Sequence, residues 1–359
     1  MFAFSKMALA RIHKALDALG VLAGVAVLHP GGRLLAVAGD SPSRPECADF
    51  GKSRNRAGGF IGESKLEMLD QLRRRSQRFT AEAFLVEGLT ITDRLLCLHR
   101  ICREHEIALP FILKPDVGQR GNGVRVIRSM RAALEYLQSV DAPVIVQRYV
   151  VGPCEAGVCY YRFPHESRGH IFAITEKIFP TITGDGIHTV EELIRTDHRA
   201  ALMAHTYLRR FASRRDEILA PGEILKLVET GNHAQGCIFR DGMHLHTEAL
   251  ERVIDEISRK VTGFFIGRYD LRYENDKDLK QGRNFQIVEL NGATSEATSI
   301  YDARNSLFSA YQTLSQQWRL VFAIGAINKA NGHAPSSLVA LWQNWRKYSV
   351  AALSYPVAD

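Results

Sequence analysis

Apolar positions in the middle of the chain alternate between the two-residue period of strands and the wider spacing of helices. From residue 111 the pattern predicts a strand over 111–114, a glycine loop, a strand over 123–127, a helix over 129–140 and a strand over 144–149. Further strands are predicted over 158–162, 170–177, 225–229, 236–239, 267–272 and 285–290, and helices over 190–196 and 250–262. This order predicts an α+β or α/β fold with two mixed subdomains.

The flanking segments complete the predicted organisation. Helices are predicted over 63–78 and 93–106, and the tail from 336 to 349 has helical spacing with Trp342 and Trp345. These tryptophans either form a homodimer contact or cap the core. The expected units are an N-terminal helix and strand region with a linker over 1–62, a small subdomain over 63–151, a large subdomain over 152–330 and a helical tail over 331–359.

Composition and charge narrow the class of protein. The 359 residues are 46% hydrophobic and 24% charged, which excludes a disordered or fibrous chain. The net charge of +7 is spread along the chain and favours anionic ligands such as phosphates. The arginine run at 73–75 has no interleaved aromatic residues, so we expect a solvated helix face and no nucleic acid partner.

The cysteines and the longest apolar run indicate the cellular compartment in which the protein is expected. The six cysteines contain no CxxC pair and are expected to be reduced thiols, which favours a cytoplasmic protein. The apolar run over 19–28 is shorter than the roughly 20 residues that a spanning helix needs. We therefore expect a helix followed by a buried strand there and no stable membrane insertion, with secretion or membrane contact as the alternative.

A lysine followed by a glycine loop is the first candidate for chemistry. Lys114 ends an apolar predicted strand and precedes Pro115, so its ammonium emerges from a buried background and needs an anionic partner. The next segment contains Gly118, Gly121 and Gly123, which let backbone N–H groups approach an anion closely. The pattern indicates a polyphosphate site, and a structural lysine beside an ordinary hairpin turn is the alternative.

Two other phosphate-binding motifs do not fit. The Gly-Lys-Ser sequence at 51–53 lacks the upstream glycine of a Walker A loop, because that position is Glu46. The glycines after Lys114 follow a GxxGxG order, the reverse of the Rossmann fingerprint, and lead into a strand instead of a helix. The sequence therefore supports neither nucleotide fold.

Oxygen-bearing side chains lie near the end of the last predicted strand. A period of two places four residues on one face of that strand: Phe285, Ile287, Glu289 and Asn291. The same rule groups three residues in 267–272: Arg268, Asp270 and Arg272. If the strands are neighbours, Asp270, Glu289 and Asn291 converge, and two carboxylates in one pocket require a proton or a cation. Hard oxygen ligands indicate magnesium, and a surface ion pair is the alternative for either motif.

Histidine and cysteine groupings are weaker candidates for a transition metal. His244 and His246 are spaced as HxH on a predicted strand, and His99, Cys102 and His105 share one predicted helical stripe. Neither group has a further ligand at a suitable spacing. We therefore expect polar surface at both places.

Taken in order, these segments resemble the ATP-grasp superfamily of carboxylate–amine ligases. The resemblance lies in Lys114 with its glycine loop, the hinge-like segment 146–150, the Gly-Arg-Tyr-Asp sequence at 267–270 and the Val-Glu-Leu-Asn sequence at 288–291, and it covers 111–302. The sequence Thr-Gly-Asp-Gly-Ile-His-Thr at 183–189 looks most like the cyanophycin synthetase branch. The Gly-Arg-x-Asp motif is similar to that of D-alanine–D-alanine ligases.

The resemblance implies an ATP-grasp fold in which two α+β subdomains grip ATP, with the glycine loop as a lid. It implies a nucleotide-binding set of Lys114, Gly118, Arg120, Gly121, Gly123, Gln147, Tyr149, Val150, Glu155 and Lys177, with Glu155 on the ribose. It implies Asp270, Glu289 and Asn291 as ligands of Mg²⁺, for which Mn²⁺ can substitute. Arg268 and Lys114 are the implied catalytic residues, Arg268 neutralising charge on the transferred phosphoryl group.

The implied reaction is formation of an amide or peptide bond through an acyl phosphate, with release of ADP and phosphate. The substrates are expected to be a small-molecule carboxylate and an amine of the amino acid or peptide class. A phosphotransferase or kinase and a non-catalytic nucleotide-binding module remain as alternatives. The chain departs from the family pattern at Gln147, at Cys154 beside Glu155, and after Asn291, where Gly292 replaces a Pro-Gly turn.

Overall fold

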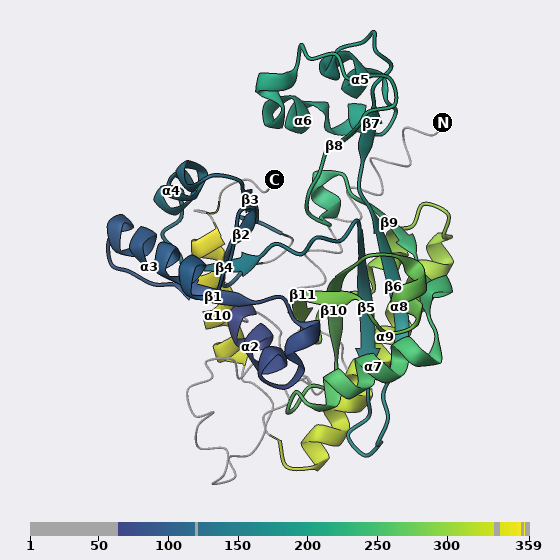
Figure 1. Ribbon diagram of the computed structural model, residues 1–359. Helices are drawn as coiled ribbons and strands as arrows, with labels where there is room; N and C mark the ends of the chain where they lie inside the picture. The colour runs from purple at the N-terminus through teal and green to yellow at the C-terminus, as the bar shows by residue number, and fades with distance from the viewer. Residues whose placement is uncertain (1–63, 119–120, 334–337, 353–354, 356–359) are drawn as a thin grey trace.

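Two antiparallel sheets carry most of the described chain, which in the computed structural model comprises residues 64–118, 121–333, 338–352 and 355. The four-stranded sheet has the order β1-β4-β2-β3, and the five-stranded sheet has the order β11-β10-β5-β6-β9. Strand β11 is therefore the edge of the larger sheet, and Figure 1 shows it next to the unit that contains the smaller sheet. The predicted helix and strands of 1–62 lie outside the described residues.

The small unit has helices on one face of its sheet. Its elements are β1 Ala83–Val86, α3 Ile91–Glu104, β2 Phe111–Pro115, β3 Arg125–Ile127, α4 Met130–Ser139 and β4 Val144–Arg148. Leu98 of α3 and Leu137 of α4 are buried in one core with Leu113 of β2. Lys114 lies on the other face of the sheet because successive strand residues alternate between faces. That face also carries Ile145, the register partner of Lys114, against which helix α2 (Lys65–Ser76) packs.

The large unit is built around the five-stranded sheet. Its elements are β5 Cys154–Tyr161, β6 His170–Ile178, β9 Ile238–Asp241, α7 Glu248–Arg259, β10 Ile266–Tyr273, α8 Asp276–Lys280, β11 Phe285–Asn291, the 3₁₀ turn η7 Thr298–Tyr301 and α9 Leu307–Ala330. Helix α7 buries Leu250, Ile254 and Ile257 against Val158 and Leu271 of the sheet. Apolar residues spaced by three and four along α7 produce this single buried stripe.

Helix α2 Lys65–Ser76 joins the two units. Leu69 packs against Ala83 and Ile145 of the small sheet, whereas Leu72 lies in the core of the large unit. The chain after α2 then continues beside β11, where the Ala81 N–H donates to the Ile287 carbonyl at 3.0 Å. One helix thus packs on both units and holds β11 beside the small unit.

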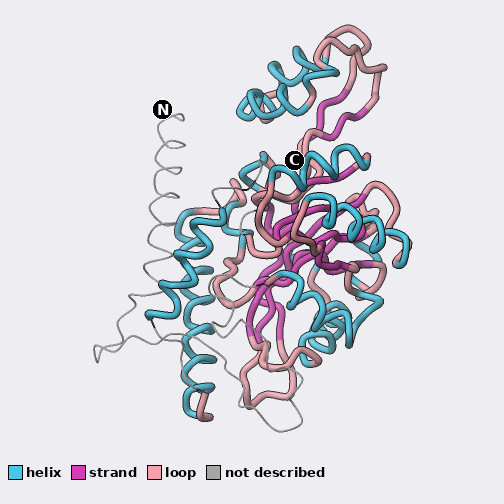
Figure 2. Tube along the Cα trace, turned by 90° about the vertical axis from the view of Figure 1, so that its left-hand side faces the viewer, coloured by secondary structure: helices cyan, strands magenta, loops and turns pink. Residues whose placement is uncertain are grey.

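A third group of elements projects from the large unit. It consists of β7 Thr181–Thr183, α5 Val190–Thr196, α6 Ala204–Arg210 and β8 Ile224–Lys226. Figure 1 shows these elements at the top of the view, away from the two sheets, and Figure 2 shows the same projection from the side. Ile182, Ile194, Tyr207 and Leu219 form its own core. The predicted helix over 190–196 is confirmed as α5, and Thr189 and Glu192 form a capping box at its start.

Several elements differ from the sequence predictions. Strand β1 and the 24-residue helix α9 were not predicted. The predicted strand at His244 and His246 is wrong, because Met243–Leu245 forms a 3₁₀ turn and His246 pairs with Glu251 at 3.1 Å. No group of three or more His, Cys, Asp or Glu residues suited to a metal occurs in the described ranges.

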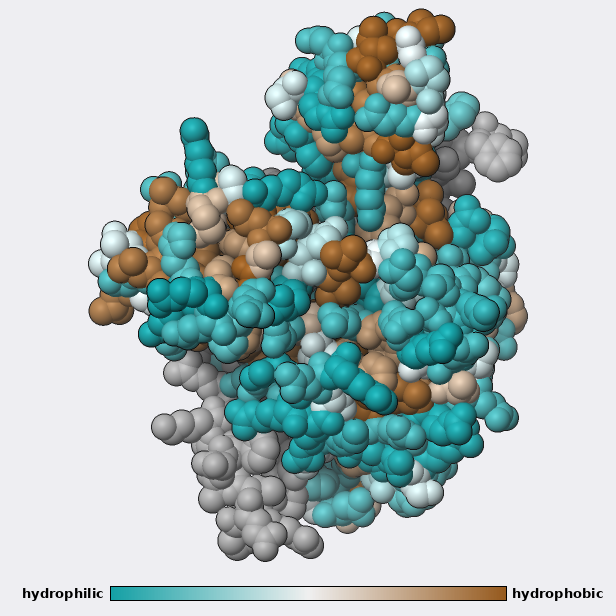
Figure 3. Space-filling model, in the orientation of Figure 1, coloured by the Kyte–Doolittle hydropathy of each residue, from teal (hydrophilic) through white to brown (hydrophobic). Residues whose placement is uncertain are grey.

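The tail helix α10 Leu338–Ala352 is confirmed, and Trp342 and Trp345 on it are 55% and 43% exposed. Exposed apolar side chains also occur in the small unit at Leu89, Leu96 and Leu109, and Figure 3 shows brown side chains over that unit. The cysteines that the structure describes are all free thiols. Within the described ranges, no helix has both the length and the apolar character that crossing a membrane requires.

Candidate functional site

A row of charged side chains occupies one face of the five-stranded sheet. The antiparallel register pairs Glu155 with Lys177 and with Arg272, and pairs Asp270 with Glu289. Partners in register share a face, so these side chains point to the same side, and β11 also places Asn291 opposite Arg268 there. Helix α7 covers the opposite face. The predicted neighbourhood of the two motif strands is confirmed.

A β-bulge in β11 places Glu289 in this row. The register passes from the pair Asp270 and Glu289 directly to Leu271 and Ile287, leaving Val288 without a partner. Phe285 and Ile287 consequently lie in the core behind the sheet. The prediction that they share a face with Glu289 is wrong, because a strict period of two cannot anticipate an inserted residue.

The bulge also exposes a carbonyl group that joins the two sheets. The Val288 carbonyl accepts hydrogen bonds from Lys114 Nζ at 3.3 Å and from Gln147 Nε2 at 3.0 Å. Gln147 pairs with Ile112 across β4 and β2, which puts its side chain on the same face as that of Lys114. The structure therefore brings Lys114 and Gln147 to the strand that carries Glu289.

Charges alternate along the buried row. Lys177 Nζ lies 2.8 Å from Glu155 Oε1 and 3.2 Å from Asp270 Oδ1. Arg272 Nε donates to Glu155 at 3.2 Å, and Arg268 Nε donates to Asp270 at 3.1 Å. Buried ions are tolerated only when they are paired in this way. Although burial alone would lower it, the pKa of Lys177 is raised because Asp270 and Glu155 stabilise the ammonium.

Lys65 is a member of the site that the sequence analysis missed. It is the first residue of α2, and its ammonium forms an ion pair with Glu289. Burial acts to raise the pKa of Glu289, but Lys65 and Lys114 outweigh it and bring the pKa to about 2. Ser64 donates to Asp116 at 2.9 Å and thereby fixes the start of α2 beside Lys114. No sequence motif distinguishes Lys65 from other lysines in helical first turns.

Lys114 is a buried cation whose charge is only partly compensated by its surroundings. Its side chain is enclosed, and burial lowers the pKa of Lys114 from 10.5 to about 8 although Glu289 opposes that change. The Lys65 ammonium nearby contributes in the same direction as burial. A lysine held this way gains from any ligand that brings further negative charge.

The predicted metal ligands form a compatible donor set. Asp270, Glu289 and Asn291 offer two carboxylates and an amide oxygen, which are the hard donors that Mg²⁺ prefers. Asn291 Nδ2 lies 3.4 Å from Asp270 Oδ2, so rotation of the amide would present its oxygen to the same point. Lys65 now pairs with Glu289, and Arg268 pairs with Asp270. These ammonium and guanidinium groups provide the positive charge that the carboxylates require.

Two glycines of the loop after Lys114 have left-handed backbone conformations. Gly121 and Gly123 have φ values of +68° and +74°, which residues with a Cβ adopt at a cost. A Cβ at Gly123 would lie 2.8 Å from the Pro115 ring, and one at Gly121 would lie 2.8 Å from the Asn232 amide. The ring of Tyr355 packs beside Gly118. Predicted loop residue Arg120 lies outside the described residues.

The hinge residues contact a loop that the sequence analysis did not select. Tyr149 Oη donates to Glu229 at 3.0 Å, and Arg272 Nη1 donates to the Val150 carbonyl at 3.2 Å. Gly231, in the same loop as Glu229, lies so close that a Cβ there would be 2.1 Å from Glu155 Oε1. The loop thus covers Glu155, and both carboxylate oxygens of Glu155 already have partners. Its predicted ribose contact stays a prediction.

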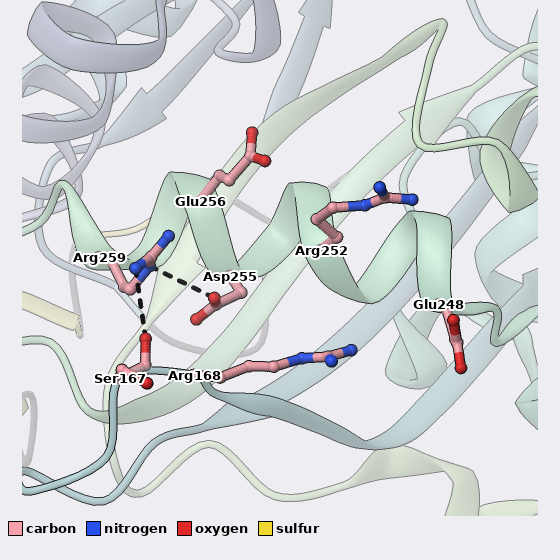
Figure 4. Close-up of a pocket in the computed structure, with 7 residues that line it drawn as sticks. All are labelled: Ser167, Arg168, Glu248, Arg252, Asp255, Glu256 and Arg259. Carbon is pink, nitrogen blue, oxygen red and sulfur yellow. Dashed lines mark hydrogen bonds and ion pairs between the residues drawn. The ribbon is translucent and has the colours of Figure 1, made fainter.

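A surface pocket of about 410 Å³ lies away from this row. It is lined by Ser167, Arg168, Glu248, Arg252, Asp255, Glu256 and Arg259. Figure 4 shows these side chains along α7 and the adjacent loop, with Arg259 bound to Asp255 and to the Ser167 carbonyl. Because α7 packs on the opposite face of the large sheet, this pocket is separate from the charged row.

Comparisons with known proteins agree with the resemblance drawn from the motifs. No protein-family model matches the chain. The chain is 27% identical over 210 residues to a cyanophycin synthetase of Synechocystis sp., in an alignment that covers 51% of this chain and 23% of that protein. This chain therefore spans less than a quarter of the length of the curated relative. The match confirms the predicted resemblance to the cyanophycin synthetase branch.

The chain also aligns with solved structures at low sequence identity. D-alanine–D-alanine ligase from Bacillus anthracis is 12% identical, with coverage of 82% of this chain and 78% of that chain and a TM-score of 0.44. A bifunctional glutathione synthetase from Pasteurella multocida is 13% identical, with coverage of 73% and 38% and a TM-score of 0.36. The mixed helix and sheet architecture with antiparallel sheets agrees with the predicted fold class.

Proposed function

We propose that this chain is an ATP-dependent carboxylate–amine ligase that forms an amide or peptide bond through an acyl phosphate. The observation that carries the proposal is the meeting of two sheets at one charged point. Lys114 reaches the Val288 bulge of β11 beside Glu289, which is paired across the strands with Asp270. A cation from one unit and paired carboxylates from the other suit a polyphosphate with its metal ion.

The nucleotide would lie between the two units. Lys114 and Lys177 would contact its phosphates, together with the backbone of Gly118, Gly121 and Gly123 and the side chain of Arg120. The adenine would lie beside Gln147, Tyr149 and Val150, and Glu155 would bind the ribose. Support comes from the common face shared by Lys114 and Gln147 and from the positive φ values of the glycine loop. The loop containing Gly231 would have to move to free Glu155.

Asp270, Glu289 and Asn291 would hold Mg²⁺, with Mn²⁺ as a substitute. When bound, the ion would shield the negative charge of the phosphate oxygens. The chain itself contributes Arg268, which Asp270 holds at 3.1 Å and which would neutralise charge on the transferred phosphoryl group. Lys65 would shift from Glu289 toward the phosphates once that carboxylate is engaged.

The reaction needs no nucleophile from the protein. A carboxylate oxygen of the substrate attacks the γ-phosphorus of ATP, and the bond from that phosphorus to ADP breaks. The amine nitrogen then attacks the acyl carbon of the acyl phosphate, the carbon–oxygen bond to phosphate breaks, and the nitrogen loses a proton. The protein would hold both reactants in line and stabilise the developing charge, which requires Lys114 and Arg268 to stay in place.

The test is a screen of carboxylates with amines of the amino acid and peptide class, in the presence of ATP and Mg²⁺. We expect ADP and a new amide mass together, and a hydroxamate when hydroxylamine replaces the amine. Asp270→Asn and Glu289→Gln should each lower ADP formation at least a hundredfold, while Glu256→Gln on α7 should not. ADP formation without a hydroxamate would indicate a phosphotransferase. Tight ATP binding without any ADP would indicate a nucleotide-binding module.

A further inference from the structure

The turn that follows β11 holds one carboxylate in a fixed position beside the charged row. Gln317 of α9 is buried and clamps the backbone on both sides of Glu296. Its Nε2 donates to the Ser295 carbonyl at 2.8 Å, and its Oε1 accepts from the Ala297 N–H at 2.9 Å. Arg268 Nη1 donates to the Glu296 carbonyl at 2.9 Å. The backbone of Glu296 is therefore held by the same arginine that binds Asp270.

The Glu296 side chain is oriented by an aromatic pair. Tyr301 Oη donates to Glu296 Oε1 at 3.0 Å. The Tyr301 ring stacks on His233 with ring centroids 5.7 Å apart and an interplanar angle of 19°. His233 belongs to the same loop as Gly231, which lies over Glu155. Tyr301 thus orients the carboxylate of Glu296, and the stack with His233 orients Tyr301.

Glu296 lacks the cation that every carboxylate of the charged row possesses. Glu155, Asp270 and Glu289 each form an ion pair, whereas Glu296 forms none with any residue the structure describes. The side chain is nevertheless partly buried, and it lies near enough to Cys159 that its charge contributes to raising the pKa of that thiol, after burial and Asp270. A partly buried carboxylate with only a neutral hydroxyl partner is suited to receive a positive charge.

We propose that Glu296 binds the positively charged group of the acceptor amine, so that the second substrate is a cation such as an amino acid or a diamine. This inference rests on the proposed ligase function and specifies its acceptor. Primary amines are protonated near neutral pH because their pKa is about 8 to 10. The attacking nitrogen therefore transfers one proton to the Glu296 carboxylate before it attacks the acyl carbon, and it loses a second proton when the amide forms. Binding at Glu296 places the protonated amine near Arg268, which donates to the Glu296 carbonyl. Tyr301 is the positioning residue that fixes the carboxylate.

The first experiment measures binding, and therefore does not depend on turnover. Ligand-observed NMR would be recorded on the full chain with glycine, L-lysine, L-arginine and putrescine, each with its N-acetylated analogue as the uncharged probe. We expect at least one cationic probe to bind the wild type and Glu256→Gln with equal affinity, and to bind Glu296→Gln at least tenfold more weakly. Equal affinity for Glu296→Gln, or no binding of any cationic probe to the wild type, would overturn the proposal.

A second variant tests whether Glu296 and Tyr301 bind the cation or only stabilise the fold. Tyr301→Phe keeps the ring that stacks on His233 but removes the hydroxyl, so we expect a two- to fivefold loss of cation binding with an unchanged melting temperature. If Glu296→Gln lowers the melting temperature in proportion to its loss of binding, the role is structural and the proposal is wrong. Retained secondary structure and melting behaviour alongside lost binding would support it.

Hydroxamate formation distinguishes this inference from the proposed function. Hydroxylamine is uncharged at pH 8, so Glu296→Gln should form hydroxamate from ATP and a carboxylate at the wild-type rate while the KM for a cationic amine rises at least tenfold. A parallel loss of both activities would contradict acceptor recognition. If the wild type forms neither ADP nor hydroxamate, the ligase function fails, while the binding measurement still decides whether Glu296 is a cation site.

Discussion

The ammonium of Lys114 in β2 donates a hydrogen bond to the carbonyl of Val288 in β11 at 3.3 Å, across 174 residues of sequence. This contact exists because the bulge leaves the Val288 carbonyl outside the strand ladder. Gln147 donates to the same oxygen at 3.0 Å. The small and large units therefore meet at a main-chain atom, and the side chains beside it are the ones that we propose bind ATP.

Replacing Lys114 should stabilise the fold and at the same time abolish ATP binding. Lys114→Met keeps the side-chain volume but removes a buried charge whose pKa is lowered to about 8, so we expect a higher free energy of unfolding at pH 7. The same variant should lose ATP binding. In the wild type the unfolded state binds more protons between about pH 8 and 10.5, so stability should rise with pH across that range. Urea denaturation and ATP titration at several pH values provide the measurement.

A fall in stability of Lys114→Met at pH 7 would contradict this account of its burial. Lys329→Met, on the solvent-exposed end of α9, serves as the control because its side chain has no role in the site. It should change neither ATP binding nor the pH dependence of unfolding.

Removing Lys65 should weaken the acid sensitivity of the fold. The pKa of Glu289 is about 2 in the folded protein against an ordinary 4.5, so protonation favours the unfolded state. The wild-type free energy of unfolding should therefore fall as the pH decreases from 4.5 to 2. In Lys65→Met the pKa of Glu289 should rise, and this decrease should become smaller. Chemical denaturation across that pH range, with Lys329→Met as the control, checks the prediction.

Glycine substitutions can separate backbone strain from steric overlap. Gly123 and Gly263 have nearly equal φ values of +74° and +76°, but only Gly123 has atoms within 4 Å of the position that a Cβ would occupy. We expect Gly263→Ala to cost about 1 kcal/mol of unfolding free energy from its backbone conformation alone. Gly123→Ala should cost more, because its Cβ overlaps the Pro115 ring, and it alone should weaken ATP binding. If both substitutions lower the free energy of unfolding equally, the Pro115 ring can move aside without a loss of stability.

If phosphates bind beside Lys177, added phosphate should replace a carboxylate that has been removed from the charged row. Glu155→Gln leaves Arg272 and Lys177 with less compensating charge, and breaking a buried pair costs about 3 kcal/mol or more. Inorganic tripolyphosphate should raise the melting temperature of Glu155→Gln more than that of the wild type, because it supplies the missing negative charge. Glu256→Gln should respond like the wild type. Identical stabilisation in all three proteins would place the phosphates away from Lys177.

Local sequence patterns predicted much of the fold. The strands that contain Lys114, Asp270 and Glu289 were located within a few residues, since apolar alternation and flanking turn residues are encoded nearby in the chain. Helix α9 escaped prediction because its apolar residues are not concentrated on one stripe, and it packs on the sheet over only part of its length. Strand β1 escaped because four residues carry too little periodicity.

Sequence by itself determined which chemical groups the site contains and the order in which they occur: a lysine, a glycine loop, and carboxylates at the ends of strands. Tertiary structure alone decided how they meet. The bulge at Val288 turns Glu289 to the site face, helix α2 brings Lys65 to that carboxylate, and Gln317 fixes Glu296 beside Arg268. The physical reason is that strand register and helix packing depend on partners far apart in the chain, whereas residue periodicity reports only on near neighbours.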